Sequence, residues 1–516
     1  MALRARACIP EGFLRLVFAL LLSIGTISWS GSVWGQEPPR PATLERVLAA
    51  AESALGAGAD GEAIAEFRHA QGLRGLRLLY GSGDQFLIAE GAAIHRGLAE
   101  AYLRTHEPFA AAVEAGRGVN LVVDDARLWT LLGLARHRLA DIGGAVEALE
   151  RALALDSGAA EAHWGLALTA IAANRPAEAQ AHGRQAYRIS RQPQYVLGIA
   201  QWASVEGDYT SAAEALGEYL ALAPGDPQVE GHRRLQRFLE EVGRAPANRI
   251  DDRVRRVQLN FDLKAGDEIP YVPVRFNGRE PAYILFDTGA ERNVIDRSYA
   301  ESIGVDPIYP GGPLHGAYRQ SPGGYAIVDR LTLGSIEVER VPFAVGDFAA
   351  LHLRGQGDYR IAAVLNPALV FRNFLVVLDF GHRRIELVRY DAGGEDYAEM
   401  RTRLRKTTTP FWFDVNGVWP VIPVSLDGAR SLPFLADTGA SDLLIARGTA
   451  AALRLDPARF VAAAGGHTAE NLRFLLLDGM PDEPWGIAVH GILGFPFFRG
   501  MRVVFDYQSM TMILEN

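Results

Sequence analysis

The sequence predicts a multidomain α + β protein, in which an α-helical repeat solenoid precedes two related all-β lobes. Three observations predict this fold class. Small alanines recur at a period near 34 residues in the first half of the chain. Short strand-like segments separated by Gly and Pro fill the second half, and the tetrapeptide Asp-Thr-Gly-Ala occurs there twice. A chain of 516 residues also exceeds what one hydrophobic core usually organises.

The N-terminal residues predict an export signal. Basic residues precede and enter an apolar run at 16–27, and small residues follow it. We expect 1–35 to be a signal peptide and 36–43 to be a proline-rich lead-in. The predicted location is therefore periplasmic or secreted. Membrane contact is expected only if the signal stays uncleaved, because the apolar run is short for a full span.

The amino-acid composition argues against several classes of site and partner. The single cysteine, Cys8, lies in the predicted signal, so the mature chain would have no disulfide, no cysteine nucleophile and no thiolate metal site. A net charge of −9 without a long basic run argues against a nucleic-acid partner. The histidines show no paired metal-ligand spacing, and we expect neither a metal nor a cofactor.

Residues 44–242 predict the helical repeat domain. Apolar residues follow helical spacing, and the small residues Ala111, Ala145, Ala179 and Ala212 recur at steps of 34, 34 and 33. Alanines let neighbouring helices approach, and stacking buries faces that one helix pair would leave exposed. This period and its large/small alternation resemble the tetratricopeptide repeat. The resemblance implies a protein partner for this domain.

The second half predicts a duplicated β lobe behind a linker. Residues 243–256 are charged, contain Gly and Pro, and read as that linker. The first lobe is expected at 257–395 and the second at 408–516, with the polar residues 391–407 connecting them. The order of motifs repeats: a Val- and Pro-containing strand precedes each Asp-Thr-Gly, and an apolar pair follows it later.

The two tetrapeptides make Asp287 and Asp437 the candidate catalytic residues. They stand 437 − 287 = 150 residues apart, each behind an apolar strand. Two carboxylates held close together cannot both ionise easily, so they share one proton. The ionised partner can take a proton from a water while the protonated partner polarises a peptide carbonyl. The sequence leaves open which of the two is protonated first.

The paired lobes resemble those of retropepsin-like and pepsin-like aspartic peptidases, and the alanine after each Asp-Thr-Gly resembles the retroviral type. The resemblance implies that the two threonines bond across the base of the site and that an apolar pair followed by Gly packs beneath each loop. The supporting residues expected on this basis are Thr288, Gly289, Ala290, Thr438, Gly439, Ala440, Ile492, Leu493 and Gly494. The first lobe departs from the pattern, because Asn366 stands where that Gly is expected.

Residues 311–328 predict a glycine-tipped hairpin that serves as a substrate flap. Either Tyr318 or Tyr325 covers the carboxyls, or both tyrosines pack only on their own lobe. The interval from Asp287 to Asn366 is longer than its counterpart in the second lobe, so the first lobe is expected to carry the longer flap. An extended peptide would lie under it, paired as an added strand.

The function favoured by these features is an exported aspartic endopeptidase acting on a peptide or protein substrate, with a helical domain that recruits a protein partner. The alternative is a catalytically inactive scaffold that binds extended peptides on the same fold. Asn366 and the unequal lobes favour that alternative. A site shared between two chains is a further variant, which two lobes in one chain make unnecessary.

Overall fold

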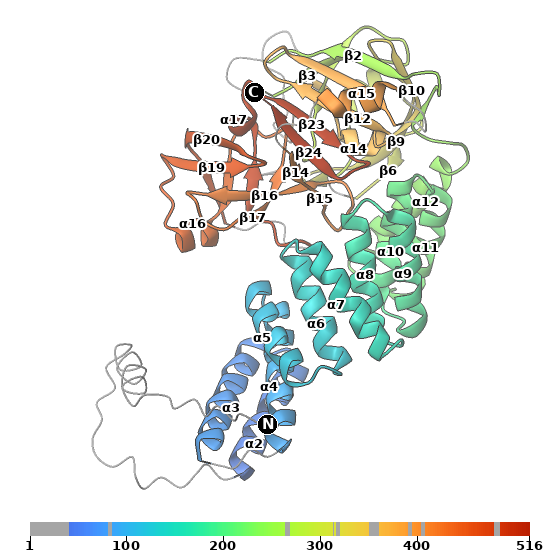
Figure 1. Ribbon diagram of the computed structural model, residues 1–516. Helices are drawn as coiled ribbons and strands as arrows, with labels where there is room; N and C mark the ends of the chain where they lie inside the picture. Colours follow the sequence, from blue (N-terminus) through green and yellow to red (C-terminus); the bar gives the residue numbers. More distant parts are fainter. Residues whose placement is uncertain are drawn as a thin grey trace.

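The computed structural model describes residues 41–80, 85–263, 269–312, 314–315, 320–349, 361–390, 395–403, 408–478 and 486–515. The predicted signal peptide lies outside these ranges. Helices come first and β lobes follow, which confirms the expected fold class (Figure 1). The first described helix begins at Pro41, so the end of the expected lead-in is helical. No described helix is long and apolar enough to cross a membrane.

Antiparallel helix pairs stack in a curved row (Figure 1). The described helices are α2 (Pro41–Gly56), α3 (Asp60–Tyr80), α4 (Gln85–Arg104), α5 (Pro108–Leu121), α6 (Ala126–Arg138), α7 (Ile142–Leu155), α8 (Ala160–Ala172), α9 (Pro176–Ile189), α10 (Pro193–Glu206), α11 (Tyr209–Leu222) and α12 (Val229–Val242).

The repeat in the sequence corresponds to a repeat in how the helices pack. Its four small residues, one each in α5, α7, α9 and α11, are fully buried; they are Ala111, Ala145, Ala179 and Ala212. The turns inside the helix pairs repeat as well, since each holds one residue with positive φ. These residues are His106, Ala140, Asn174 and Gly207, with φ of 60°, 61°, 57° and 88°. Equivalent turns and equivalent small residues therefore recur from pair to pair.

The first lobe is built on an eight-stranded sheet of order β1-β10-β5-β11-β4-β3-β9-β6. Its strands are β1 (Arg249–Ile250), β3 (Tyr271–Phe276), β4 (Ala282–Phe286), β5 (Val294–Asp296), β6 (Tyr309–Pro310), β9 (Gly324–Leu333), β10 (Ile336–Gly346) and β11 (Ile361–Leu365). Two helices, α13 (Arg297–Ser302) and α14 (Pro367–Val370), and a hairpin of β7 (Leu314–His315) and β8 (Gln320–Ser321) complete it.

The second lobe repeats this order, with shorter counterparts of β9 and β11. It contains β15 (Trp412–Phe413), β16 (Pro420–Leu426), β17 (Leu432–Ala436), β18 (Leu444–Ala446), α16 (Arg447–Leu453), β19 (Phe460–Ala464), β20 (His467–Leu472), β21 (Leu475–Leu477), β22 (Gly491–Leu493) and α17 (Phe495–Phe498). The matching pairs β4–β11 and β17–β22 are both parallel, so the two loops that carry Asp-Thr-Gly begin in equivalent places.

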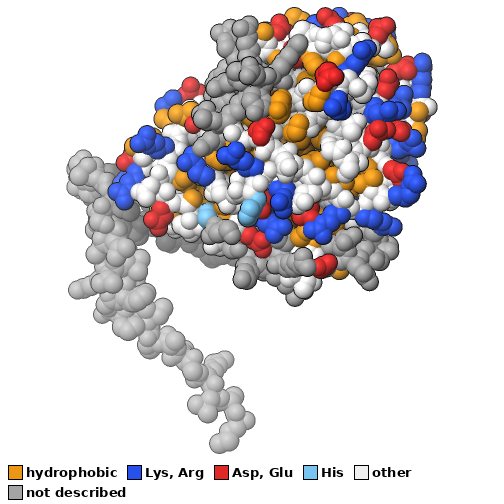
Figure 2. Space-filling model, turned by 90° about the horizontal axis from the view of Figure 1, so that it is seen from above, with side chains coloured by type: hydrophobic (Ala, Val, Ile, Leu, Met, Phe, Trp, Pro, Cys, Tyr) orange, Lys and Arg blue, Asp and Glu red, His pale blue; other side chains and the backbone are white. Residues whose placement is uncertain are grey.

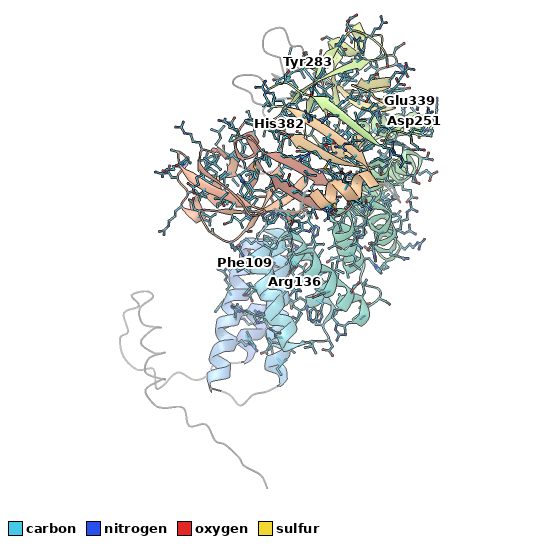
Figure 3. All side chains as sticks on the ribbon, turned by 45° about the horizontal axis from the view of Figure 1, so that its top comes forward. Phe109, Arg136, Asp251, Tyr283, Glu339 and His382 are labelled. Carbon is cyan, nitrogen blue, oxygen red and sulfur yellow. The ribbon has the colours of Figure 1, made fainter. Side chains whose placement is uncertain are left out.

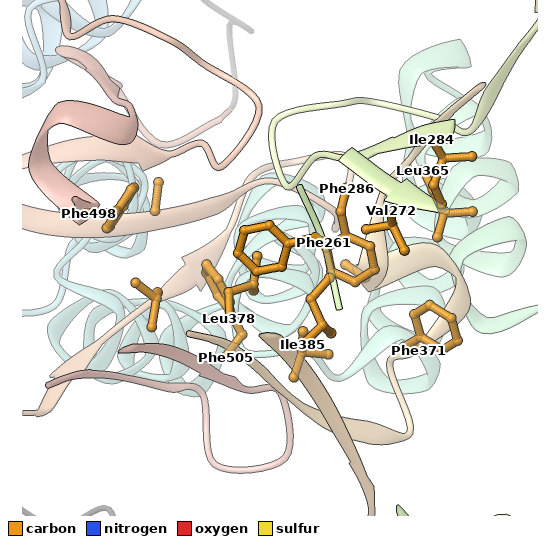
Figure 4. Packing of buried hydrophobic residues seen from close by; sticks show 14 of the residues in the cluster. Phe261, Val272, Ile284, Phe286, Leu365, Phe371, Leu378, Ile385, Phe498 and Phe505 are labelled. Atoms are coloured by element: carbon orange, nitrogen blue, oxygen red, sulfur yellow. The ribbon is translucent and has the colours of Figure 1, made fainter. Parts of the chain in front are cut away.

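A six-stranded sheet joins the lobes in the order β14-β24-β23-β12-β13-β2. Its strands are β14 (Thr408–Pro410), β24 (Thr511–Glu515), β23 (Arg502–Asp506), β12 (Phe374–Asp379), β13 (Arg384–Arg389) and β2 (Arg256–Asn260). Each lobe supplies three strands, and β12 pairs with β23 at the centre. One apolar cluster runs through both lobes, with Phe286, Phe371 and Phe505 among its labelled members (Figure 4).

The expected connection at 391–407 contains a helix, α15 (Glu395–Arg403). Tyr397 of this helix donates a hydrogen bond to Asp506 at 3.0 Å, and Arg401 pairs with the same carboxylate at 3.1 Å. Asp506 also accepts the N–H of Ser509, as a turn residue does. Its side chain is fully buried.

The helical domain packs on the second lobe. The Trp202 indole N–H donates to the carbonyl of Val415 at 2.9 Å, and the N–H of Ala488 donates to the carbonyl of Arg138 at 2.8 Å. Phe109 lies at the start of α5 near this lobe (Figure 3), where the Arg430 guanidinium is 4.3 Å from its ring centroid. Helices of three different pairs, α5, α6 and α10, therefore contact this lobe.

The same domain packs on the first lobe through α12. Phe238 stacks on Tyr325 with ring centroids 4.9 Å apart, and Arg234 donates to the carbonyl of Gly311 at 3.1 Å. Arg340 donates to two carbonyls at the end of α12. The solenoid thus bridges both lobes.

On the opposite side, seen from above in Figure 2, positive and negative side chains are interspersed over the described surface.

Candidate active site

Two apolar strands carry the candidate aspartates to one place. Nearly every residue of β4 and β17 is buried, and Asp287 and Asp437 are the first residues after them. The N–H of Asp287 donates to the carbonyl of Leu365 at 2.9 Å, and that of Asp437 donates to the carbonyl of Leu493 at 3.1 Å. Each loop is therefore fixed at its start by the end of a parallel neighbour strand.

Four hydrogen bonds between Thr288 and Thr438 and the opposite loops join the two lobes. Thr288 Oγ1 donates to the carbonyl of Ala436 at 2.7 Å and accepts the N–H of Thr438 at 3.0 Å. Thr438 Oγ1 donates to the carbonyl of Phe286 at 2.9 Å and accepts the N–H of Thr288 at 3.2 Å. Both threonines are at most 1% exposed, so water does not compete for these bonds. These are the bonds that the sequence resemblance implies.

Gly289 and Gly439 bring each loop close to the opposite carboxyl. A Cβ added at Gly289 would overlap Cγ of Asp437, and one added at Gly439 would overlap Cγ of Asp287. Neither glycine is among the described residues with positive φ. Close approach, rather than an unusual backbone angle, is therefore what requires glycine here. Each glycine N–H also donates at 2.7 Å to Oδ1 of the aspartate of its own loop.

The two carboxyls form a hydrogen-bonded pair with raised pKa values. Burial raises the pKa of Asp287 well above its ordinary value, and the negative charge of Asp437 and the hydrogen bond to it raise that pKa further. Burial also raises the pKa of Asp437, whereas hydrogen bonds from Asp287 and from nearby backbone amides oppose the rise. Both pKa values are raised, so the two carboxyls are suited to share one proton. Part of each aspartate remains open to solvent.

Asn366 fits its position without strain. Its φ of −87° and ψ of 119° are extended backbone, and its side chain is fully buried. Nδ2 donates to the carbonyl of Ala290 at 2.6 Å, and Oδ1 accepts the N–H of Ala368 at 2.8 Å. Its own N–H donates to Oδ1 of Asn293 at 3.0 Å. Every polar group of the side chain is paired, so the departure from Gly does not disrupt the loop.

The second lobe reaches the same result with Gly494 and Phe495. The N–H of Phe495 donates to the carbonyl of Ala440 at 2.9 Å, and a Cβ at Gly494 would lie 2.7 Å from that oxygen. In the first lobe Pro367 stands in place of Phe495 and has no N–H. The side-chain amide of Asn366 supplies the missing donor, because its Nδ2 donates to the carbonyl of Ala290. The sequence signal for this exchange is Asn-Pro in one lobe against Gly-Phe in the other.

The remaining supporting residues lie around the loops. Ala290 and Ala440 provide the carbonyls just described, and Leu493 is buried. Ile492 is paired with Leu435 of β17 and Leu444 of β18. Within the described residues, no group of three or more His, Cys, Asp or Glu side chains is placed to hold a metal ion.

The structure separates the two flap tyrosines. Tyr318 lies outside the described residues. Tyr325 is 9% exposed and packs against Phe238 of α12, so it does not pack only on its own lobe. The sequence did not predict this position of Tyr325, because no local sequence pattern indicates where the helical domain packs on the first lobe. The hairpin β7–β8 does lie within the expected flap at 311–328.

A hollow of about 430 Å³ lies in the helical domain, away from the carboxyls. Basic and acidic side chains both contribute to its wall, which is formed by Arg184, Tyr187, Arg188, Arg191, Val196, Ile199, Ser211, Glu214, Ala215 and Glu218. It adds no group to the carboxyl chemistry.

Residues 272–362 match the aspartyl protease family model, and this range includes Asp287. The helical part is similar to three solved structures. Pseudomonas aeruginosa pilF has 20% identity and a TM-score of 0.32, with 39% of this chain and 86% of that chain covered. A thermophilic TPR protein of Thermus thermophilus has 16% identity, a TM-score of 0.30, and coverage of 39% and 98%. A tetratricopeptide repeat protein from Parabacteroides merdae has 12% identity, a TM-score of 0.30, and coverage of 39% and 75%. No curated protein matches this chain.

Replacing Asn366 by Gly is expected to lower the free energy of unfolding by about 1–3 kcal/mol, because it leaves the buried carbonyl of Ala290 and the N–H of Ala368 unpaired. Adding Pro367→Ala restores an N–H where Phe495 has one and should recover part of the loss. Urea denaturation measures both variants. A single variant as stable as the wild type would contradict this role of Asn366.

The raised pKa of the pair predicts a pH-dependent effect of Asp437→Asn. Between the ordinary and the raised pKa the folded chain binds more protons than the unfolded chain, so the wild-type free energy of unfolding falls as pH rises. Asp437→Asn removes one carboxyl of the pair, so the free energy of unfolding of this variant should fall much less as pH rises. It should match the wild type near pH 3 and become more stable than it as pH rises toward about 7, by about 1.4 kcal/mol for each tenfold change in proton affinity.

The matched control for this pH experiment is Asp478→Asn, because Asp478 is an exposed carboxylate of the same lobe. Asp478 pairs with Arg447 on the surface and lies outside the carboxyl pair, so its replacement should not reproduce the pH-dependent gain of Asp437→Asn. Identical pH profiles for the Asp437 and Asp478 variants would show that the pair carries no raised pKa.

Proposed function

We propose that this chain is an aspartic endopeptidase that hydrolyses peptide bonds between Asp287 and Asp437. The observation that carries the proposal is the hydrogen-bonded carboxyl pair held by cross-lobe bonds of Thr288 and Thr438. The aspartyl protease family match at 272–362 supports the same reaction class.

The proposed mechanism uses the single proton that the pair holds. The ionised carboxylate of the pair accepts a proton from a water whose oxygen then forms a bond to the peptide carbonyl carbon. The protonated aspartate of the pair donates a hydrogen bond to the carbonyl oxygen and stabilises the charge that develops there. The carbon–nitrogen bond then breaks, and the amine leaves with a proton from the pair. The two aspartates exchange protonation states in each cycle.

The amides of Gly289 and Gly439 have a separate role in this proposal. They donate to the inner oxygen of each carboxyl and oppose part of the pKa rise that burial causes. One carboxyl can therefore stay ionised at mildly acidic to neutral pH. The outer oxygens stay available to water and substrate because each aspartate is partly open to solvent.

The proposal extends to location and partners. The basic and apolar N-terminal residues support export, with a mature chain that begins at Gln36. The helical repeats support recruitment of a protein partner or substrate. The hollow between α9 and α11, with both arginine and glutamate in its wall, is the part of that domain suited to polar protein segments.

An inactive peptide-binding scaffold is the other candidate. Its main support was Asn366, and the paired hydrogen bonds of that side chain remove the objection to an intact first loop. The unequal lobes remain in its favour, since β7–β8 has no counterpart among the described strands of the second lobe.

Asp287→Asn and Asp437→Asn should each lower cleavage of unstructured peptides by at least about a hundredfold, because each removes one half of the acid–base pair. Asp478→Asn is the matched control and should cleave at the wild-type rate. Digestion of a peptide library between pH 3 and about 8, read by mass spectrometry, measures this. Measurable peptide binding with no products from the wild type would select the scaffold.

Expression of the full chain in a bacterial host should yield a product that begins at Gln36 in the periplasmic or secreted fraction. N-terminal sequencing and intact mass identify that start. A full-length chain recovered with the membranes would instead show that the N-terminal segment is retained as an anchor.

A further inference from the structure

Arg372 stands where three parts of the molecule meet. It follows α14, and its Nε donates to the carbonyl of Ala368 in that helix at 3.0 Å. Nη1 donates to Oδ1 of Asn174 in the helical domain at 2.7 Å, and Nη2 donates to the carbonyl of Gly417 in the second lobe. The guanidinium also lies 4.6 Å from the ring centroid of Phe413. One side chain therefore contacts both lobes and the solenoid.

Ion pairing does not explain why an arginine is here. The three acceptors described for its guanidinium are neutral oxygens, and burial lowers the pKa of Arg372 to about 10, although the nearby Tyr507 and Asp414 act to raise it. A desolvated cation with neutral partners contributes little net stability. What the planar guanidinium supplies is geometry, because it directs several donors along fixed directions at once.

Asn174 is specialised for this contact. It occupies the turn position that His106, Ala140 and Gly207 fill in the other repeats. These four residues differ in side chain but share a positive φ. Gly satisfies that requirement, as Gly207 shows. The amide of Asn174 does more, since Oδ1 accepts from Arg372 and Nδ2 donates to the carbonyl of Tyr507 at 2.8 Å.

Hydrogen bonds continue from this junction to the loop of Asp287. Arg372 holds the carbonyl of Ala368, and the N–H of Ala368 donates to Asn366 at 2.8 Å. Asn366 in turn donates to the carbonyl of Ala290, three residues after Asp287. No equivalent link is found in the described part of the second lobe, because Gly500 stands six residues after Gly494, where Arg372 stands six residues after Asn366.

We propose that Arg372 is a positioning residue, through which Asn174 of the helical domain holds α14 and thereby the Asp287 loop in register with its partner loop. For catalysis this inference rests on the proposed peptidase function. It gives the repeat domain a role inside the enzyme, in addition to any recruitment. Arg372 and Asn174 contact both lobes, but the hydrogen bonds through Ala368 and Asn366 lead only to the Asp287 loop, so disturbing them should affect the first loop more than the second.

The test compares Asn174→Gly, Arg372→Met and the double variant with Asn471→Gly in the full chain. Asn174→Gly keeps the backbone conformation that Gly207 adopts and removes only the amide, so it should fold even if Arg372→Met does not. Asn471 has a φ of 56° in an exposed part of the second lobe, which makes its change to Gly the matched control.

Hydrogen exchange read by mass spectrometry is the first readout, because it needs no catalysis. Exchange in 284–293 should become about tenfold faster in Asn174→Gly, while 434–443 stays within about twofold of the wild type. The double variant should be no worse than Arg372→Met alone, since both changes cut one path. Equal acceleration of both loops, no acceleration, or additive single effects would each overturn the proposal.

Cleavage is the second readout. Asn174→Gly should lower kcat about tenfold with little change in KM, because a small shift of one carboxyl disturbs the reacting geometry. An unchanged kcat would refute the positioning role. A wild type that cleaves nothing, combined with the lobe-selective exchange pattern, would refute the peptidase function and leave the structural link in place.

Discussion

The structure depends on the cross-lobe hydrogen bonds of Thr288 and Thr438, which hold two acidic groups closer than they would stay by themselves. Each hydroxyl donates to one strand end and accepts from the facing loop, so neither lobe can move without breaking bonds in a buried place. The raised pKa values follow from this constraint, because burial and the neighbouring charge both disfavour full ionisation. The central strand pair β12–β23 also holds the two lobes together, because each lobe supplies one of its strands.

Duplication supplied two loops, and each lobe supports its loop differently. The second lobe uses a residue without a side chain, Gly494, and a backbone donor from Phe495. The first lobe uses Asn366 and Pro367, in which a side-chain amide replaces the donor that proline lacks. The carbonyl that receives the bond is equivalent in both lobes. A departure from a family motif can therefore preserve the interaction that the motif provides.

Much of the architecture could be predicted from the sequence because it depends on local periodicity. The spacing of Ala111, Ala145, Ala179 and Ala212 predicts stacked helix pairs, and the burial of all four confirms it. The pairing of Asp287 with Asp437 also followed from repetition. The contacts between domains could not be predicted in this way. Tyr325 was expected at the flap and lies against α12, because Phe238 is distant in sequence and carries no motif that points to it.

The central claim is that Asp287 and Asp437 hold one proton between them, and titration of carboxyl-labelled aspartates by NMR tests it most directly. The account predicts two linked protonation steps for this pair, one of them well above the ordinary aspartate value, which collapse to a single step when either residue is replaced by Asn. Two independent titrations near the ordinary value of about 3.9, unaffected by replacement of the partner, would contradict it.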